Sequence, residues 1–179
     1  MTVGRGDDAR LVAELAHLAP GDVVVDTGCG PGTAARHAAR GGARVIGVDP
    51  APVMLRMARA LTHRANVDYV EGSAEALPLP DDSATVVWSI ATVHHWRDLD
   101  DGLREVRRVL RPGGRFVAIE RHTQPNATGI ASHGWTTEQA EELARVLSTC
   151  GFRDTRVEPP RRSGRRSVIA VLASAPEPT

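Results

Sequence analysis

The stretch that decides the fold reads VVVDTGCGPG and occupies residues 23–32. Three β-branched residues lead into an acid, a glycine-rich turn, and a helix-favouring segment over residues 33–39. A short apolar run bounded by turn residues is typical of a buried strand. Gly28, Gly30 and Gly32 permit a sharp turn and let a ligand approach bare backbone. Because the next helix begins there with free N–H groups, the stretch predicts a strand that ends in a ligand-binding turn.

The spacing of this turn narrows the class of ligand. It is G-x-G-x-G, whereas dinucleotide-binding folds use G-x-G-x-x-G. Asp26 precedes the turn directly, where its carboxylate would repel a pyrophosphate, and Pro31 removes one N–H from the helix start. A ligand with amino and sulfonium cations suits the site better. The alternatives are a tight turn with no ligand and, less favoured, a nicotinamide-dependent oxidoreductase.

A second apolar run, residues 44–48, ends at Asp49 and Pro50. With the first strand and the helix between them it forms a βαβ unit, which predicts parallel strands and a right-handed crossover. A carboxylate at this strand tip can accept hydrogen bonds from both hydroxyls of a ribose. The alternative is a helix cap, with Pro50 at the first helical position. Met54 follows closely enough to contact an adenine, although packing is the commoner role of methionine.

Farther along, strands and helices continue to alternate, and turn residues separate them. The expected helices cover residues 7–18 and 99–110, the second ending in a turn at 111–114, and a further helix is capped by Thr136 or Thr137. The expected strands cover residues 67–70, 84–90 and 115–120. Two final strands, over 152–157 and 167–172, form an antiparallel pair joined by a proline- and arginine-rich turn.

Four segments of this pattern resemble one family. They are DTGCGPG at residues 26–32, EGSAEALP at 71–78, HHWRD at 94–98 and RPGG at 111–114. In this order they resemble class I S-adenosylmethionine-dependent methyltransferases of the ubiquinone/menaquinone C-methyltransferase-like (methyltransferase type 11) group. The resemblance covers roughly residues 20–120. It implies an α/β fold with a doubly wound, Rossmann-like seven-stranded sheet of order 3-2-1-4-5-7-6, the last strand antiparallel, and S-adenosyl-L-methionine as cofactor.

The resemblance also implies which residues bind that cofactor. They are Asp26, Gly28, Cys29, Gly30, Asp49, Pro50, Met54, Ser73, Ala74, Glu75, Ser89 and Ile90. The chain departs from the family at Ser73, where an Asp usually contacts the adenine amino group. A serine hydroxyl still accepts a hydrogen bond from an amine, but more weakly than a carboxylate does. Cys29 is interpreted as a small residue beneath the ligand in preference to a redox group.

Methyl transfer is a direct displacement at the sulfonium methyl carbon, so the protein mainly aligns the reactants. A hydroxyl or protonated amine nucleophile also needs a base. His94 and His95 are the candidates, His94 being preferred, and the alternative is that both only line the pocket. We expect no metal. A set of His94, His95, Glu120 and His122 at neighbouring strand ends is kept as an alternative metal site.

Composition limits the partners. The 179 residues fit one domain, 41% are hydrophobic and the formal net charge is zero, so nothing draws the chain to nucleic acid or a membrane. Two cysteines and the lack of a leader or membrane-length apolar run predict a cytoplasmic protein. The arginines of residues 153–166 are interpreted as a solvated hairpin in preference to a site for an anionic acceptor or RNA.

The expected layout is a disordered segment over residues 1–6, a helix over 7–19, a cofactor-binding core over 20–120, an acceptor-side loop over 121–135, and a final helix and hairpin over 136–173. So little chain lies outside the core that we expect a partner subunit, such as a second copy in a homodimer, or a large acceptor to complete the pocket. The predicted function is methyl transfer to an O, N or C nucleophile of a small molecule. The alternatives are a cofactor-binding protein without catalysis and a methyltransferase subunit completed by a partner.

Overall fold

The computed structural model describes residues 5–63, 66–127 and 133–177. Its strands are β1 Val23–Thr27, β2 Arg44–Asp49, β3 Val67–Glu71, β4 Ala84–Ile90, β5 Leu110–Arg121, β6 Arg153–Ser163 and β7 Arg166–Ser174. Its helices are α1 Arg5–Leu15, α2 Thr33–Arg40, α3 Pro52–Leu61, α4 Leu99–Val109 and α5 Thr137–Thr149, and Val93–His95 form one 3-10 turn. Within the described residues, none of the helices is long and apolar enough to cross a membrane.

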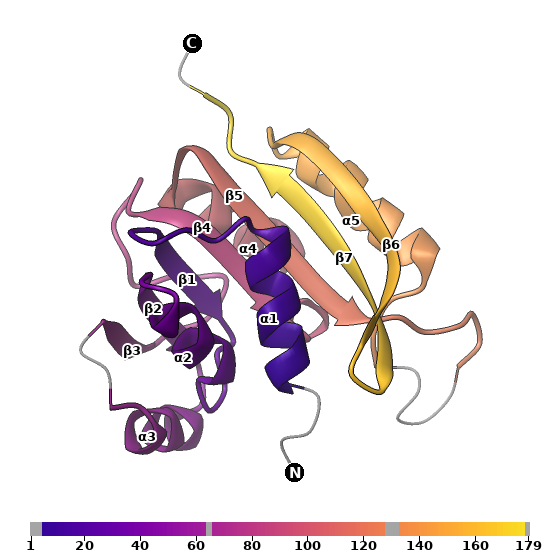
Figure 1. Cartoon of the computed structure of the whole chain (residues 1–179). Coiled ribbons are helices and arrows are strands. Elements are labelled where there is room, and N and C mark those ends of the chain that lie inside the picture. Colours follow the sequence, from indigo (N-terminus) through magenta and orange to yellow (C-terminus); the bar gives the residue numbers. More distant parts are fainter. Residues whose placement is uncertain (1–4, 64–65, 128–132, 178–179) are drawn as a thin grey trace.

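The strands form a single seven-stranded sheet in the order β3-β2-β1-β4-β5-β7-β6. Strand β7 runs antiparallel to both of its neighbours, and the other strands are parallel to one another. Helices α1, α2 and α3 cover one face of the sheet and α4 and α5 cover the other (Figure 1). The predicted order and the single reversed strand are confirmed.

Alternation along the strands fills a core on each face. Val24 packs into the cluster under α1 and α2, and its neighbour Val25 packs into the cluster under α4 and α5. A strand buried on both faces reads as a continuous apolar run, as β1 does. Trp88 of β4 and Phe116 of β5 are the largest fully buried side chains, one on each face. Truncating either ring to alanine would cost about 3–5 kcal/mol.

Helix α1 is displaced from its predicted position. It begins at Arg5, so the last two residues of the segment expected to be disordered, 5 and 6, lie in the helix; residues 1–4 lie outside the described chain. It ends at Leu15, before the predicted end, because His17 adopts a left-handed φ of 47°. The N–H groups of His17 and Leu18 then return to carbonyls of the last turn, which closes the helix end.

The turn predicted at residues 111–114 lies inside a strand. Strand β5 begins at Leu110, which pairs with Ala84, and the next residues are looped out as a bulge before the ladder resumes. Gly113 sits in this bulge with a φ of 70° and donates its N–H to the carbonyl of Ala175. The C-terminal segment therefore holds the bulge in place.

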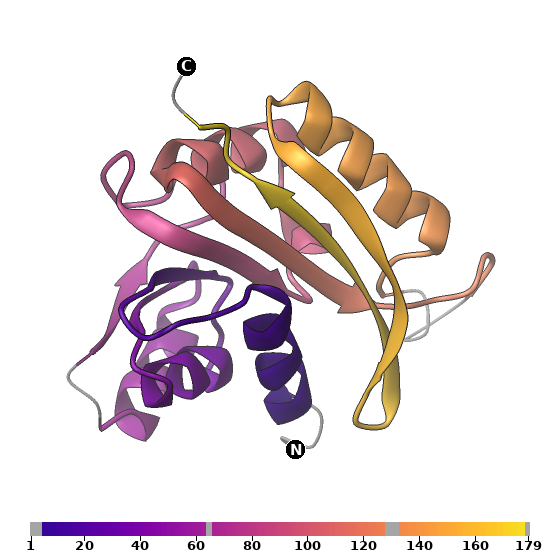
Figure 2. The same cartoon turned by 45° about the horizontal axis from the view of Figure 1, so that its top comes forward.

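The last two strands are longer than predicted. Strand β6 continues through Pro159 and Pro160 to Ser163, and the register with β7 shifts between Glu158 and Arg161. Prolines are tolerated there because β6 is an edge strand and the bulge removes the need for their N–H groups. The β6–β7 hairpin consequently extends past the sheet, and its turn lies beside the N-terminal end of α1 (Figures 1 and 2).

Candidate active site

The glycine loop between β1 and α2 uses its own N–H groups internally. Those of Gly28 and Cys29 donate to one carbonyl of β2 at 2.8 and 3.0 Å. That of Gly30 donates to a carboxylate oxygen of Asp49 at 2.8 Å, and that of Gly32 donates within the loop at 3.0 Å. The remaining loop residue is a proline. Because residues 28–32 hold no free N–H, the loop is not built to bind a pyrophosphate.

Two of the loop glycines are required because neighbouring side chains fill the space that a Cβ atom would occupy, and not only because a ligand approaches there. Gly28 has a φ of 69°, and a Cβ there would lie 2.5 Å from the side chain of Thr92. Gly32 has a φ of 76°, and a Cβ there would lie 2.1 Å from the hydroxyl of Tyr69. Both positions are left-handed and filled by neighbouring side chains, so only glycine fits.

Asp26 closes the end of β1 and is 2% exposed. Its Oδ2 atom has no hydrogen-bond partner among the described residues, and neither has the indole nitrogen of Trp88, its register partner on β4. Burial, together with the nearby charge of Asp49, raises the pKa of Asp26 to about 7. A buried carboxylate with one oxygen unpaired is costly, and a ligand cation would relieve that cost.

Two adjoining cavities lie at the carboxyl ends of β1, β2 and β4. The first, of about 280 Å³, we call the loop cavity, and its lining is Asp8, Asp26, Gly28, Cys29, Gly30, Thr33, Ala34, Asp49, Met54, Ile90, Ala91, Thr92, His95 and Arg166. The second, of about 450 Å³, we call the Ser73 cavity, and its lining is Gly28, Asp49, Pro50, Gly72, Ser73, Ala74, Glu75, Thr92, His95, Trp96 and Arg97.

These cavities collect the predicted cofactor-binding residues with one exception. The backbone contact of Ser89 with the cofactor stays a prediction, and the Ser89 side chain is fully buried, lines neither cavity and hydrogen-bonds the Thr92 hydroxyl. Strand alternation explains this, because the next residue, Ile90, lines the loop cavity. Met54 lines the loop cavity and not the Ser73 cavity. A larger hollow, of about 510 Å³, lies at the β3 edge, away from these residues.

Asp49 lies where the two cavities meet. One carboxylate oxygen accepts the N–H of Gly30, and the other accepts the N–H of Ala51 at 2.9 Å. Helix α3 begins at Pro52 with Ala51 as its N-cap, so the alternative with Pro50 as the first helical residue is wrong. Each oxygen of Asp49 retains a lone pair, which leaves its predicted ribose contact available.

Sequence reasoning missed Thr92 and Thr33, which line the loop cavity, and placed Arg166 only in a solvated cluster. A polar residue two positions after the end of β4 was the available signal for Thr92. Cys29 lines the same cavity, and burial raises the pKa of its thiol, which favours its interpretation as a small packing residue.

The two candidate bases lie in the 3-10 turn after β4. The Nδ1 atom of His94 is 3.0 Å from both carboxylate oxygens of Glu120, which is 1% exposed. The hydrogen bond to Glu120 raises the pKa of His94. Nδ1 therefore donates, and Nε2 is the basic atom. His95 lines both cavities, with its ring centroid 3.9 Å from that of His94.

The alternative metal site is not assembled in the part of the chain that the structure describes. His94 and Glu120 pair, but His122 directs its Nε2 atom to the hydroxyl of Thr137, at 3.3 Å. Across residues 5–63, 66–127 and 133–177, no group of three or more His, Cys, Asp or Glu side chains could hold a metal ion.

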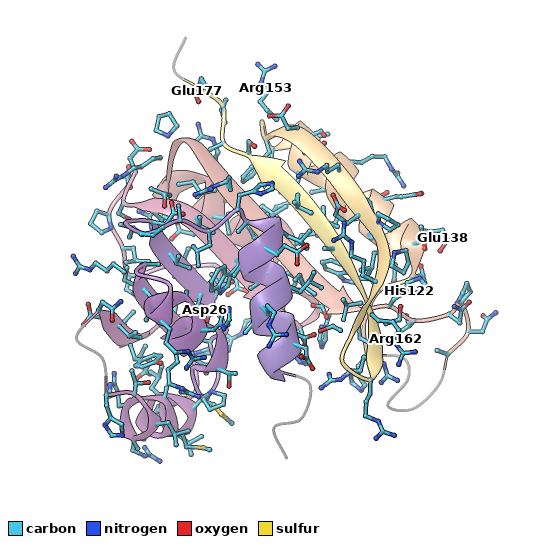
Figure 3. The ribbon with its side chains drawn as sticks, viewed as in Figure 1. Asp26, His122, Glu138, Arg153, Arg162 and Glu177 are labelled. Carbon is cyan, nitrogen blue, oxygen red and sulfur yellow. The ribbon has the colours of Figure 1, made fainter. Side chains whose placement is uncertain are left out.

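Arg166 differs from the other hairpin arginines in its surroundings. Arg156 and Arg161 both pair with Glu158, at 3.3 and 3.0 Å, as expected of a solvated face. Figure 3 shows Arg153 at the opposite end of β6, and Arg162 with His122 near the hairpin end. Arg166 differs from these because it lines the loop cavity.

The comparisons with known proteins agree with this geometry. The profile of the family described as "Methyltransferase domain" matches residues 25–118. Demethylmenaquinone methyltransferase of Tropheryma whipplei (strain Twist) is 29% identical over 174 residues, 82% of this chain and 72% of the relative. 27-O-demethylrifamycin SV methyltransferase of Amycolatopsis mediterranei (strain S699) is 34% identical over 129 residues, 68% of this chain and 47% of the relative.

The fold is also found in a solved complex between the Haloferax volcanii Trm112 methyltransferase activator and a methyltransferase. One chain of it superposes with a TM-score of 0.78 at 22% identity, covering 96% of this chain and 90% of that chain. Since the matched profile spans more than half of the 179 residues, the chain belongs to the family of methyltransferase domains. S-adenosyl-L-methionine is its cofactor, and the buried carboxylate of Asp26, with its Oδ2 atom unpaired among the described residues, fits that molecule's cationic end.

Proposed function

We propose that the chain transfers a methyl group from S-adenosylmethionine to a hydroxyl or amine of a small molecule, with His94 as the base. The observation that carries this proposal is the hydrogen-bonded pair of the buried Glu120 and His94, whose ring lies 3.9 Å from that of His95, a residue that lines both cavities. A buried carboxylate joined to an imidazole at a ligand-binding strand edge is the arrangement expected of a general base.

The cofactor would lie across both cavities. The loop cavity, with Asp26 and Ile90, suits its amino-acid end, and the Ser73 cavity suits its adenine. Asp49, at the junction, suits the ribose between them. When bound, the cofactor supplies a methyl group already activated by its sulfonium. The protein then has to hold the acceptor in line and, for O and N nucleophiles, remove a proton.

His94 is suited to that proton transfer. Glu120 accepts a hydrogen bond from the Nδ1–H group of His94, so the unprotonated Nε2 atom is free to remove a proton from the methyl acceptor. As the ring becomes positive, the carboxylate beside it stabilises the charge. A positioned base of this kind contributes about 10²- to 10⁴-fold to the rate. His95, whose ring lies against that of His94 and which lines both cavities, would form a wall between the cofactor and the acceptor.

The relatives support a small-molecule acceptor. Their names give a demethylated quinone and a demethylated rifamycin as the molecules on which they act. A partner that completes the acceptor side remains part of the proposal, because the similar Haloferax structure is a complex with an activator. Two free cysteines agree with the proposed cytoplasmic location.

The test is a screen of hydroxylated and amine acceptors for a mass gain of one methyl group, with wild type, His94→Asn, Glu120→Gln and His63→Asn. His63 is exposed beyond the end of α3 and serves as the matched control. We expect turnover to fall about 100-fold or more in the first two variants, with binding of S-adenosylhomocysteine unchanged. Cofactor binding without turnover on any acceptor would instead support the binding-protein alternative. Equal turnover by His94→Asn and wild type would remove His94 as the base.

A further inference from the structure

The charges around the loop cavity are unbalanced in a way that the proposed cofactor explains. Three of its lining residues are acids, namely Asp8, Asp26 and Asp49. The amino-acid end of S-adenosylmethionine carries an ammonium and a carboxylate. Acids bind the ammonium, but they repel the carboxylate, which needs a donor of opposite charge. Of the residues that line the loop cavity, Arg166 carries a guanidinium and can supply that donor.

The register of the hairpin directs Arg166 toward this cavity. Arg166 is the first residue of β7 and pairs with Ser163 of β6, so their side chains share one face of the ribbon. Val168, two residues later on the same face, packs into the core cluster under α1 and α2. Asp26 lies on that face as well, because it alternates with Val24 of the same cluster. Arg166 therefore reaches the site from the side on which Asp26 lies.

The backbone that carries Arg166 is held against α1. The buried hydroxyl of Ser163 donates to the buried carboxylate of Asp8. Gly164 follows with a φ of 57°, and a Cβ there would lie 2.5 Å from Oδ2 of Asp7. These contacts seat the turn on the first turns of α1, as Figures 1 and 2 both show. The hairpin is thus positioned as a wall of the site and not as a free solvated loop.

The guanidinium of Arg166 is available to a ligand. Its guanidinium makes no hydrogen bond or ion pair with any residue in the described part of the chain, whereas Arg161 pairs with both Glu14 and Glu158. A guanidinium is always charged and presents a planar fork of donors that matches a carboxylate.

We propose that Arg166 binds the carboxylate of the amino-acid end of S-adenosylmethionine, opposite the acids that receive its ammonium. The inference rests on the cofactor of the proposed function and adds the β6–β7 hairpin to the cofactor site. In this arrangement, the last strand pair of the sheet selects ligands that retain the intact amino acid.

The test compares two ligands that differ in that carboxylate alone, S-adenosylmethionine and its decarboxylated analogue, by calorimetric titration. The proteins are wild type, Arg166→Gln, Arg166→Lys and the matched control Arg165→Gln, whose side chain does not line the cavity. We expect wild type and Arg165→Gln to bind S-adenosylmethionine about tenfold to a hundredfold more tightly than the analogue. Arg166→Gln should bind both alike, and Arg166→Lys should retain part of the preference.

Three outcomes would overturn the proposal. One is an unchanged preference in Arg166→Gln, and another is an equal loss of affinity for both ligands, which would indicate a disturbed wall. The third is unchanged cofactor binding with a raised KM for an acceptor, which would assign Arg166 to an anionic acceptor. Failure of wild type to bind S-adenosylmethionine at all would overturn the cofactor assignment as well, and so differs from these.

Discussion

Asp26 and Glu120 are buried to the same degree near the ends of two strands, but their carboxylates differ in hydrogen bonding. Asp26, at the end of β1, is 2% exposed and leaves one oxygen without a partner among the described residues. Glu120, near the end of β5, is 1% exposed and has His94 bonded to both oxygens. Alternation places them on opposite faces of the sheet. The unpaired carboxylate suits a group that arrives with a ligand, and the paired one suits chemistry that the protein performs itself.

The largest expected effect concerns cofactor binding through Asp26. Its pKa of about 7 means that, at lower pH, an ammonium must displace a proton in order to bind. The affinity of wild type for S-adenosylhomocysteine should fall about tenfold per pH unit below 7 and level off above it. Asp26→Asn should bind about tenfold to a hundredfold more weakly at pH 8, with a flat pH profile. Calorimetric titration from pH 5 to pH 9 checks this, and parallel profiles for the two proteins would contradict it.

The same carboxylate should weaken the ligand-free fold. Its pKa is raised from 3.8 to about 7, so the native state holds the proton more tightly than the unfolded state does. Its stabilising contribution is full below the unfolded value and is lost as the pH rises to about 7. Asp26→Asn should therefore raise the free energy of unfolding at pH 8 by about 1–3 kcal/mol and change it little at pH 4. Urea denaturation at the two pH values measures the difference.

Glu120→Gln should lower the free energy of unfolding, whereas Asp26→Asn should raise it. Glu120 raises the pKa of His94, so their pair stabilises the fold fully below the ordinary histidine value of 6.5 and less as the pH rises through the raised value. The variant should lose about 1–3 kcal/mol at pH 6 and less at pH 9. The titration of the His94 ring protons by NMR should move to lower pH. An unmoved titration would mean that Glu120 does not act through His94.

An exposed carboxylate supplies the smallest effect. Asp68 of β3 pairs with Arg44 at 3.5 Å, with side chains 59% and 67% exposed. Water screens such a pair, so Asp68→Asn should change the free energy of unfolding by less than about 0.5 kcal/mol at any pH between 5 and 9. A larger loss would show that burial is not what separates the first two carboxylates from this one.

The cofactor side could be predicted well from the sequence because its signals are local. A buried strand, a glycine turn and a terminal acid follow one another along the chain, and parallel strands bring such ends to one edge. The contacts that complete this side are not local. The Thr92 side chain occupies the space beside Gly28, and Tyr69 occupies that beside Gly32. The side chain of Ser89 points away from the cavities because side chains alternate along β4, so its predicted contact rests on its backbone alone.

The hairpin side could be predicted only in outline. Prolines at 159 and 160 read as a turn, and the structure instead absorbs them in a bulge of an edge strand. Extension of β6 shifts the turn to Gly164 and brings Arg166 to the site. A charge cluster gives no sign of which member faces a cavity, because that depends on register across the hairpin. The start of α5 could be narrowed to Thr136 or Thr137 because a cap is a local feature, and Thr136 is the cap, with Gln139 three residues away completing a capping box.

The bulged prolines have a consequence for how copies of this protein behave when crowded together. An outermost strand with free N–H and C=O groups invites a strand of another molecule to add to it, which leads to aggregation. On β6, two successive residues carry no N–H, the register with β7 shifts beside them, and charged side chains flank the shift, namely the ion-paired Arg156, Glu158 and Arg161 together with Arg162. The edge that carries the hairpin is thereby protected against sheet extension while its other end builds the site.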